Sequence, residues 1–194
     1  LDYTKYKFIA TDKNEVDITD IDSVHTFCRI NRPDIIINCS GLTDLEECAN
    51  NPDLAYAVNA VGVRNIAQEA EAIGAKLIQI STDDVFGTTE NNTPLNEFDS
   101  ISPRSIYGKS KAAGEKFVRT LMSRYVIIRS SWVYGVGKDY INLVLNAVEN
   151  GEDFYAASNQ YSSPTSAKEL AKVLVEFIDN EYYGTYHIVC KGCC

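Results

Sequence analysis

Short apolar runs rich in β-branched residues recur along the chain, and this recurrence constrains the fold more than any other feature. They lie at residues 8–10, 35–39, 77–80 and 125–128. An amphipathic stretch long enough for a helix follows each run, which is typical of βαβ units. The second run does not alternate with polar residues, so it suits a strand buried on both faces. We therefore predict an α/β fold, a doubly wound parallel sheet with helices on either side.

The intervening segments carry the signals that begin and end helices. One helix is expected to open at Asp20-Ile21-Asp22-Ser23 and run toward Asn31, with Pro33 ending it, and a second to follow Pro52 until Gly74. A third is expected to begin near Ser102-Pro103 and to carry residues 107–121. These helices supply the crossover connections that a parallel sheet requires.

After Trp132 the regular alternation of strands and helices stops, because glycine and proline residues separate shorter predicted elements. We expect helices over residues 141–149 and 167–179, and strands over residues 154–156 and 186–189. This predicts two parts: a dinucleotide-binding Rossmann-like domain at residues 1–134, and a small substrate-binding lobe at residues 135–194, interleaved with the sheet.

Composition narrows the class of partner. The formal net charge is -9, whereas a nucleic-acid surface needs clustered Lys and Arg, so no nucleic acid is expected. No apolar stretch approaches the roughly 18 to 20 residues that span a bilayer, so we expect no membrane contact and a cytoplasmic protein. Cys190, Cys193 and Cys194 lack a second set of ligands nearby, so no metal is expected.

Tyr107 and Lys111 are four residues apart in a predicted helix, so both side chains leave the same face. A neighbouring ammonium favours phenolate, and so we expect it to lower the tyrosine pKa and make a proton donor. Thr82 follows an apolar strand, at the end where doubly wound sheets place their ligands. Thr82 and Tyr107 can then hydrogen-bond to one carbonyl oxygen.

The trio lies within a longer, ordered set of motifs. They are Asp17-Ile18-Thr19, Arg32-Pro33-Asp34, Ala57-Val58-Asn59, Ser81-Thr82-Asp83 with Val85-Phe86, Tyr107-Gly108-Lys109-Ser110-Lys111, Ala113-Gly114-Glu115, Arg129-Ser130-Ser131-Trp132-Val133-Tyr134-Gly135, Ser163-Pro164-Thr165 and Gly184-Thr185-Tyr186-His187. In this order they resemble the dTDP-4-dehydrorhamnose reductase family of extended short-chain dehydrogenases/reductases. The resemblance covers nearly the whole chain.

The resemblance implies a function and a site. The family reduces the C4 keto group of dTDP-4-dehydro-6-deoxy-L-mannose to dTDP-L-rhamnose with reduced NADP or NAD. The resemblance assigns the catalytic roles to Thr82, Tyr107 and Lys111, and it implies that Tyr107 and Lys111 also contact the cofactor. Trp132, Thr82 and Tyr107 occupy positions at which members of the family contact the dTDP-linked sugar. A homodimer is also compatible with the family. The remaining cofactor positions implied are Asp17, Ile18, Ser40, Gly41 and Thr43.

Two features of the sequence depart from the family pattern, and a third leaves the choice of coenzyme open. The family opens with a strand and a glycine-rich turn that hold the pyrophosphate, and no such run precedes Leu1, so we expect about 15 to 25 residues to be absent. Asp84 replaces a substrate-contacting Tyr, so either its carboxylate turns away or the ligand differs. Asp12 suits the ribose hydroxyls of NAD, whereas Lys13 suits the phosphate of NADP, and both are equally compatible with a solvated turn.

Two other functions are compatible with these residues. A related nucleotide-sugar epimerase or dehydratase would share the Tyr and Lys but recycle its NAD. A non-catalytic regulatory protein, similar to the regulatory subunit of methionine adenosyltransferase, would not need the trio of Thr82, Tyr107 and Lys111.

Overall fold

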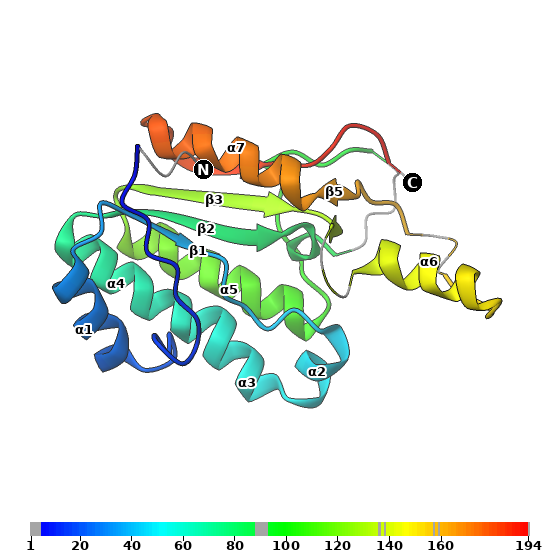
Figure 1. Cartoon of the computed structure of the whole chain (residues 1–194), viewed down its shortest axis with the longest axis horizontal. Coiled ribbons are helices and arrows are strands. Elements are labelled where there is room, and N and C mark those ends of the chain that lie inside the picture. The colour runs from blue at the N-terminus through cyan, green and yellow to red at the C-terminus, as the bar shows by residue number, and fades with distance from the viewer. Residues whose placement is uncertain are drawn as a thin grey trace.

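A parallel sheet with helices on both faces forms the body of the protein (Figure 1). The computed structural model describes residues 5–87, 93–135, 137, 139–156, 158 and 160–193. The strand order is β1-β2-β3-β6, and every neighbouring pair is parallel. The strands are β1 (Ile35–Asn38), β2 (Lys76–Thr82), β3 (Tyr125–Ser130) and β6 (Gly184–His187).

Helices α1, α4 and α5 cover one face of this sheet, and α7 covers the other (Figure 1). This arrangement confirms the predicted doubly wound α/β architecture. Helix α6 and a two-stranded parallel sheet of β4 and β5 lie outside the main layers (Figure 1). The remaining bounds are α1 (Ile21–Asn31), α2 (Leu45–Asn50), α3 (Pro52–Tyr56), the π-helical turn η1 (Ala57–Gly62), α4 (Val63–Ile73), the 3-10 turn η2 (Asp83–Val85), α5 (Ile106–Leu121), β4 (Val133–Tyr134), α6 (Tyr140–Asn150), β5 (Thr165–Ser166) and α7 (Ala167–Asp179).

Two hydrophobic cores lie on opposite faces of the sheet, because successive strand residues point to opposite sides. Leu77 and Ile127 pack in the core beneath α1, α4 and α5. Ile78, Val126 and Ile128 pack in the core beneath α7. The unbroken apolar runs of the sequence therefore reflect strands that are covered on both faces.

Two predicted strands are wrong in the described residues, since neither residues 8–10 nor residues 154–156 pair with another strand. In Figure 1 the first segment runs as a coil across the direction of the strands. The second segment instead places the Phe154 ring on Tyr140 of α6, with centroids 5.5 Å apart. An apolar run becomes a strand only where a neighbouring backbone offers hydrogen bonds, and local sequence does not report that neighbour.

The chain after residue 135 contributes to both parts of the molecule. β6 pairs with β3, and α7 packs on the main sheet, whereas α6 and β5 lie beside β4. The domain boundary at residues 134 and 135 therefore stays a prediction. Among the described helices, none combines the length and apolarity needed to cross a membrane.

Candidate functional site

The candidate site lies at the carboxyl end of β2, beside the start of α5. β2 ends at Thr82, and the Thr82 hydroxyl caps the 3-10 turn η2 by accepting from the Asp84 N–H at 3.1 Å. Helix α5 begins after Ser105, whose hydroxyl accepts from the Gly108 N–H at 2.8 Å. Side chains from the strand end and from the first turns of the helix therefore meet at one edge of the sheet.

Thr82 and Tyr107 lie close enough for their side chains to interact. Burial raises the pKa of Tyr107 to about 12; the interaction with Thr82 opposes this rise, and Asp83 and Asp84 add to it. The prediction that a neighbouring ammonium lowers this pKa is therefore wrong for the structure. The phenol is protonated at neutral pH and can serve as a hydrogen-bond or proton donor.

Lys111 lies one turn further along α5, and its ammonium is directed at the backbone of β2. Its Nζ donates to the Ile80 carbonyl at 2.7 Å, and the residue is only 6% exposed. Burial lowers the pKa of Lys111 to about 8, while Glu115 and Cys39 act in the opposite direction. Lys111 is therefore expected to lose its proton, and its positive charge, just above neutral pH.

The loop after β1 reaches the same place. A Cβ on Gly41 would lie 3.6 Å from Lys111 Nζ and 3.2 Å from Asn59 Oδ1, so the backbone there approaches both side chains closely. Asn59 is buried, accepts from the Leu42 N–H at 2.9 Å and donates to Ser110 Oγ at 3.0 Å. Asn59 thereby connects this loop to α5 through hydrogen bonds. The motif Ala57-Val58-Asn59 did not reveal this role.

Two other predicted cofactor positions belong to this loop. Ser40 is exposed, and its N–H donates to Asn38 Oδ1 at 3.0 Å. Thr43 is also exposed, and its Cγ2 would lie 3.9 Å from a Cβ on Gly41. Ser40, Gly41 and Thr43 therefore line one accessible loop next to Lys111.

The remaining predicted cofactor residues make local contacts. Asp12 Oδ1 accepts from the Asn14 N–H at 2.7 Å and so closes its own turn. Asp17 accepts from the Thr19 hydroxyl and N–H, which lowers the pKa of its carboxyl group. Ile18 packs against the first core and comes so close to Gly62 that a Cβ there would lie 2.7 Å from it. None of these contacts joins the three residues to Thr82, Tyr107 or Lys111 in the described part of the chain.

Asp83 is a site neighbour that the sequence did not single out. Its Oδ2 accepts from Ser131 Oγ at 2.8 Å and from Ser162 Oγ at 3.0 Å, and the two serines are themselves hydrogen-bonded. Its Oδ1 accepts from the Thr82 hydroxyl at 3.2 Å. Asp83 therefore links the end of β2 to the residue after β3 and to the loop before β5. These contacts join segments that are distant in the sequence, so local sequence does not reveal them.

Asp84, predicted to contact substrate, has a partner within the protein. Its Oδ2 accepts a short hydrogen bond from the Ser105 hydroxyl, and a Cβ on Gly108 would lie 2.9 Å from the same oxygen. The carboxylate thus faces the amino terminus of α5, where the helix dipole favours negative charge. Of the two expectations for this residue, the arrangement favours a side chain that turns toward the helix.

Trp132 lies just past β3 and is half-buried. Its backbone has a φ of 40°, a conformation that side-chain-bearing residues adopt infrequently. The indole contacts Tyr140 of α6 with ring centroids 4.7 Å apart. A non-glycine residue in the left-handed region is a recognised feature of binding sites.

Among the described residues, no group of three or more His, Cys, Asp or Glu side chains is placed to hold an ion. Cys194, the last member of the cysteine cluster, lies outside the described residues.

Comparison with known proteins decides the family. The family model described as the RmlD substrate binding domain matches residues 1–194. The chain belongs to this RmlD family. Membership accounts for the Rossmann-like fold, and it confirms the resemblance to dTDP-4-dehydrorhamnose reductases and the extended short-chain dehydrogenase/reductase class.

Three similar proteins illustrate the RmlD family relationship. The spore coat polysaccharide biosynthesis protein SpsK of Bacillus subtilis is 36% identical, over 97% of this chain and 66% of SpsK. The dTDP-4-dehydrorhamnose reductase of Mycolicibacterium smegmatis is 35% identical, over 88% of this chain and 52% of that enzyme. The crystal structure of the Bacillus anthracis enzyme of the same name, in complex with NADP, is 37% identical with a TM-score of 0.92, over 100% of this chain and 69% of that one. This chain therefore spans about half to two thirds of the length of these relatives.

Proposed function

We propose that the full-length protein reduces the C4 keto group of dTDP-4-dehydro-6-deoxy-L-mannose to give dTDP-L-rhamnose. The observation that carries the proposal is the convergence of Thr82, at the carboxyl end of the parallel strand β2, with Tyr107 and Lys111 from successive turns of α5. Relatives that carry the name dTDP-4-dehydrorhamnose reductase support the choice of substrate.

The residues beside Lys111 fit a dinucleotide. A Cβ on Gly41 would crowd Asn59 and Lys111, which favours a bare backbone where a ligand must pass closely. An ammonium has three N–H donors, of which the Ile80 carbonyl takes one among the described residues. We assign the other donors to the ribose hydroxyls of NADP or NAD. When bound, the reduced nicotinamide supplies the hydride for C4.

Tyr107 supplies the proton in this proposal. The phenol is protonated at neutral pH, so it can deliver that proton to the keto oxygen as the C–O double bond becomes a single bond. Thr82, which lies beside Tyr107, orients the same oxygen. The phenolate left behind is the charge that a protonated Lys111, one turn away, would stabilise.

Trp132 and Asp12 bear on where the sugar nucleotide and the coenzyme would bind. We assign the edge of the sugar nucleotide site to Trp132, whose ring lies against Tyr140. The Asp12 carboxylate accepts a hydrogen bond within its own turn, so it does not decide between the ribose of NAD and the phosphate of NADP. We therefore propose either NADP or NAD as the coenzyme. We also place the protein in the cytoplasm and include a homodimer, which sedimentation would test.

The test combines the purified full-length protein, dTDP-4-dehydro-6-deoxy-L-mannose and either NADPH or NADH. Loss of the reduced-nicotinamide absorbance and formation of dTDP-L-rhamnose are expected. Tyr107→Phe should lower turnover by about 100-fold or more, because general acid catalysis contributes about that much. Tyr182→Phe, which removes a half-exposed phenol outside the site, is the matched control. Equal turnover by the Tyr107→Phe variant would defeat the assignment.

A further inference from the structure

A buried carboxylate lies one turn beyond Lys111, and the proposed reaction does not use it. Glu115 is only 1% exposed, and each of its oxygens accepts more than one hydrogen bond. Oε1 accepts from Ser81 Oγ at 2.6 Å and from Arg129 Nε at 2.9 Å. Oε2 accepts from Arg129 Nη2 at 2.7 Å and from both terminal nitrogens of Arg119, at 2.9 and 2.7 Å.

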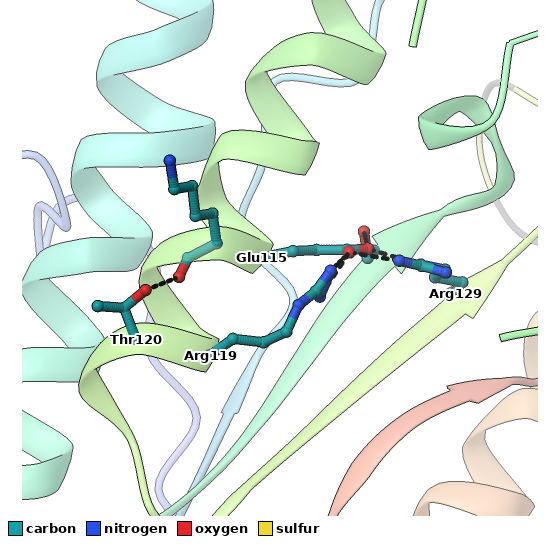
Figure 2. A network of polar contacts seen from close by, with 6 residues as sticks. Glu115, Arg119, Thr120 and Arg129 are labelled. Carbon is teal, nitrogen blue, oxygen red and sulfur yellow. Dashed lines mark hydrogen bonds and ion pairs between the residues drawn. The ribbon is translucent and has the colours of Figure 1, made fainter. Parts of the chain in front are cut away.

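These donors come from three elements of the fold. Ser81 is the residue before Thr82 on β2, Arg129 lies on β3, and Arg119 is one turn further along α5 (Figure 2). Figure 2 shows the two guanidinium groups converging on Glu115 from different sides. Two-pronged contacts between guanidinium and carboxylate fix direction as well as distance. Glu115 therefore ties α5 to the two strands on which the site depends.

Cations outnumber carboxylates in the buried part of this network. Glu115 accepts from two guanidinium groups, and Arg129 is itself 3% exposed with no partner for Nη1 among the described residues. The Arg129 cation rests over the Phe86 ring, 5.0 Å from its centroid, and also interacts with the more distant carboxylate of Glu97. Lys111 adds a further positive charge one turn away on the same helix face. Without Glu115, Arg129 and Lys111 would lose the buried carboxylate that lies on α5 beside both of them.

We propose that Glu115 is a positioning residue for the reductase site: it locks α5 against β2 and β3, and it supplies the countercharge that holds Lys111 in its ammonium form. This inference rests on the proposed function. Among the groups that face Lys111, Glu115 on α5 and Cys39 after β1 are titratable, and β2 contributes the neutral carbonyl of Ile80. Glu115 acts through Lys111 and does not itself contact the substrate.

The inference predicts opposite effects from two changes in the same network. Glu115→Gln removes a negative charge one turn from Lys111 and leaves the positive charge of Arg129 in place, so Lys111 should lose its proton at lower pH. Arg119→Gln removes a positive charge and leaves the pair of Glu115 and Arg129 intact, so Lys111 should lose its proton at higher pH. Simple loss of packing would not move the two variants in opposite directions.

The experiment is an NMR titration of the full-length protein labelled with carbon-13 at the lysine ε position. The Lys111 signal is assigned by its loss in Lys111→Met, and the parent midpoint is expected near pH 8. We expect a shift of about one pH unit downward in Glu115→Gln and about half a unit upward in Arg119→Gln. Ser81→Ala, which removes a neutral donor and leaves every charge in place, is the control and should keep the parent midpoint.

Either of two results overturns the inference: a folded Glu115→Gln variant with the parent midpoint, or an Arg119→Gln variant whose midpoint stays or falls. If Glu115→Gln does not fold, Arg119→Gln decides alone, because Arg119 is partly exposed and its loss leaves Arg129 paired. The titration needs neither substrate nor turnover. Its outcome is therefore separate from the outcome of the reductase assay.

Discussion

Tyr107 and Lys111 both have pKa values that the fold shifts from the ordinary ones. Burial and two adjacent aspartates raise the pKa of Tyr107, while burial lowers the pKa of Lys111. The sequence predicted the pairing of these residues with Thr82 from their spacing and motifs. It did not predict the raised pKa of Tyr107, because burial and the approach of Asp83 and Asp84 depend on tertiary contacts that no local pattern encodes.

At the residue scale, coenzyme binding should depend on the proton of Lys111. The ammonium is present below its pKa of about 8 and is lost as the pH rises through that value, so affinity for NADPH should fall from pH 7 to pH 9.5. Fluorescence titration of NADPH at a series of pH values measures this. Lys172→Met, a change at an exposed lysine, should keep the same pH dependence, and Lys111→Met should abolish it. A flat profile in the unaltered protein would contradict the assignment.

Helix α5 is the element that assembles the site. Tyr107, Lys111 and Glu115 follow one another at intervals of four residues and so share one face of the helix. The sequence placed the start of this helix near Ser102 and Pro103, whereas α5 begins at Ile106, after the cap that Ser105 forms. Its close fit to η2 could not be predicted, because that fit depends on a glycine with no side chain to reveal a pattern.

At the element scale, Gly108→Ala should destabilise the protein. Alanine ordinarily stabilises a helix interior by about 1 kcal/mol relative to glycine. Here the new Cβ would lie 2.4 Å from the Asp84 carbonyl oxygen, so α5 must shift away from η2. A net loss of about 1 to 3 kcal/mol in the free energy of unfolding is expected from urea denaturation. Lys116→Ala, on the exposed face of α5, should change it by less than about 0.5 kcal/mol; equal stability of the two variants would argue against the close approach.

At the scale of the whole molecule, the sheet joins segments that are distant in sequence. The sequence predicted the alternation of strands and helices, since strands buried on both faces leave unbroken apolar runs. It did not predict which segments form strands: residues 8–10 and 154–156 lie outside the strands, whereas β6 from the end of the chain completes the main sheet. Pairing depends on a neighbouring backbone, and so it is decided by the assembled fold.

Lys76 illustrates such a distant connection. From the first residue of β2, its Nζ donates to the carbonyls of Phe177 and Asn180, each at 2.7 Å, at the carboxyl end of α7. A cation there also complements the helix dipole. Lys76→Met should therefore lower the free energy of unfolding by about 2 kcal/mol and increase hydrogen exchange in α7.

Lys172→Met is the matched control for Lys76→Met, because Lys172 forms an exposed ion pair with Glu169 on the same helix. Exposed pairs contribute at most about 1 kcal/mol, so a smaller change is expected. Faster exchange in both variants, or in neither, would contradict the role of Lys76 in docking α7.

Isotope transfer tests the proposed reduction most directly. The full-length protein is incubated with dTDP-4-dehydro-6-deoxy-L-mannose and NADPH that carries deuterium at the transferring position of the nicotinamide, and the product is analysed by NMR and mass spectrometry. We predict dTDP-L-rhamnose with one deuterium at C4 of the sugar, formed with consumption of one coenzyme per product and about 100-fold more slowly by Tyr107→Phe. A sugar product without deuterium, with the coenzyme recovered in its reduced form, would contradict the account.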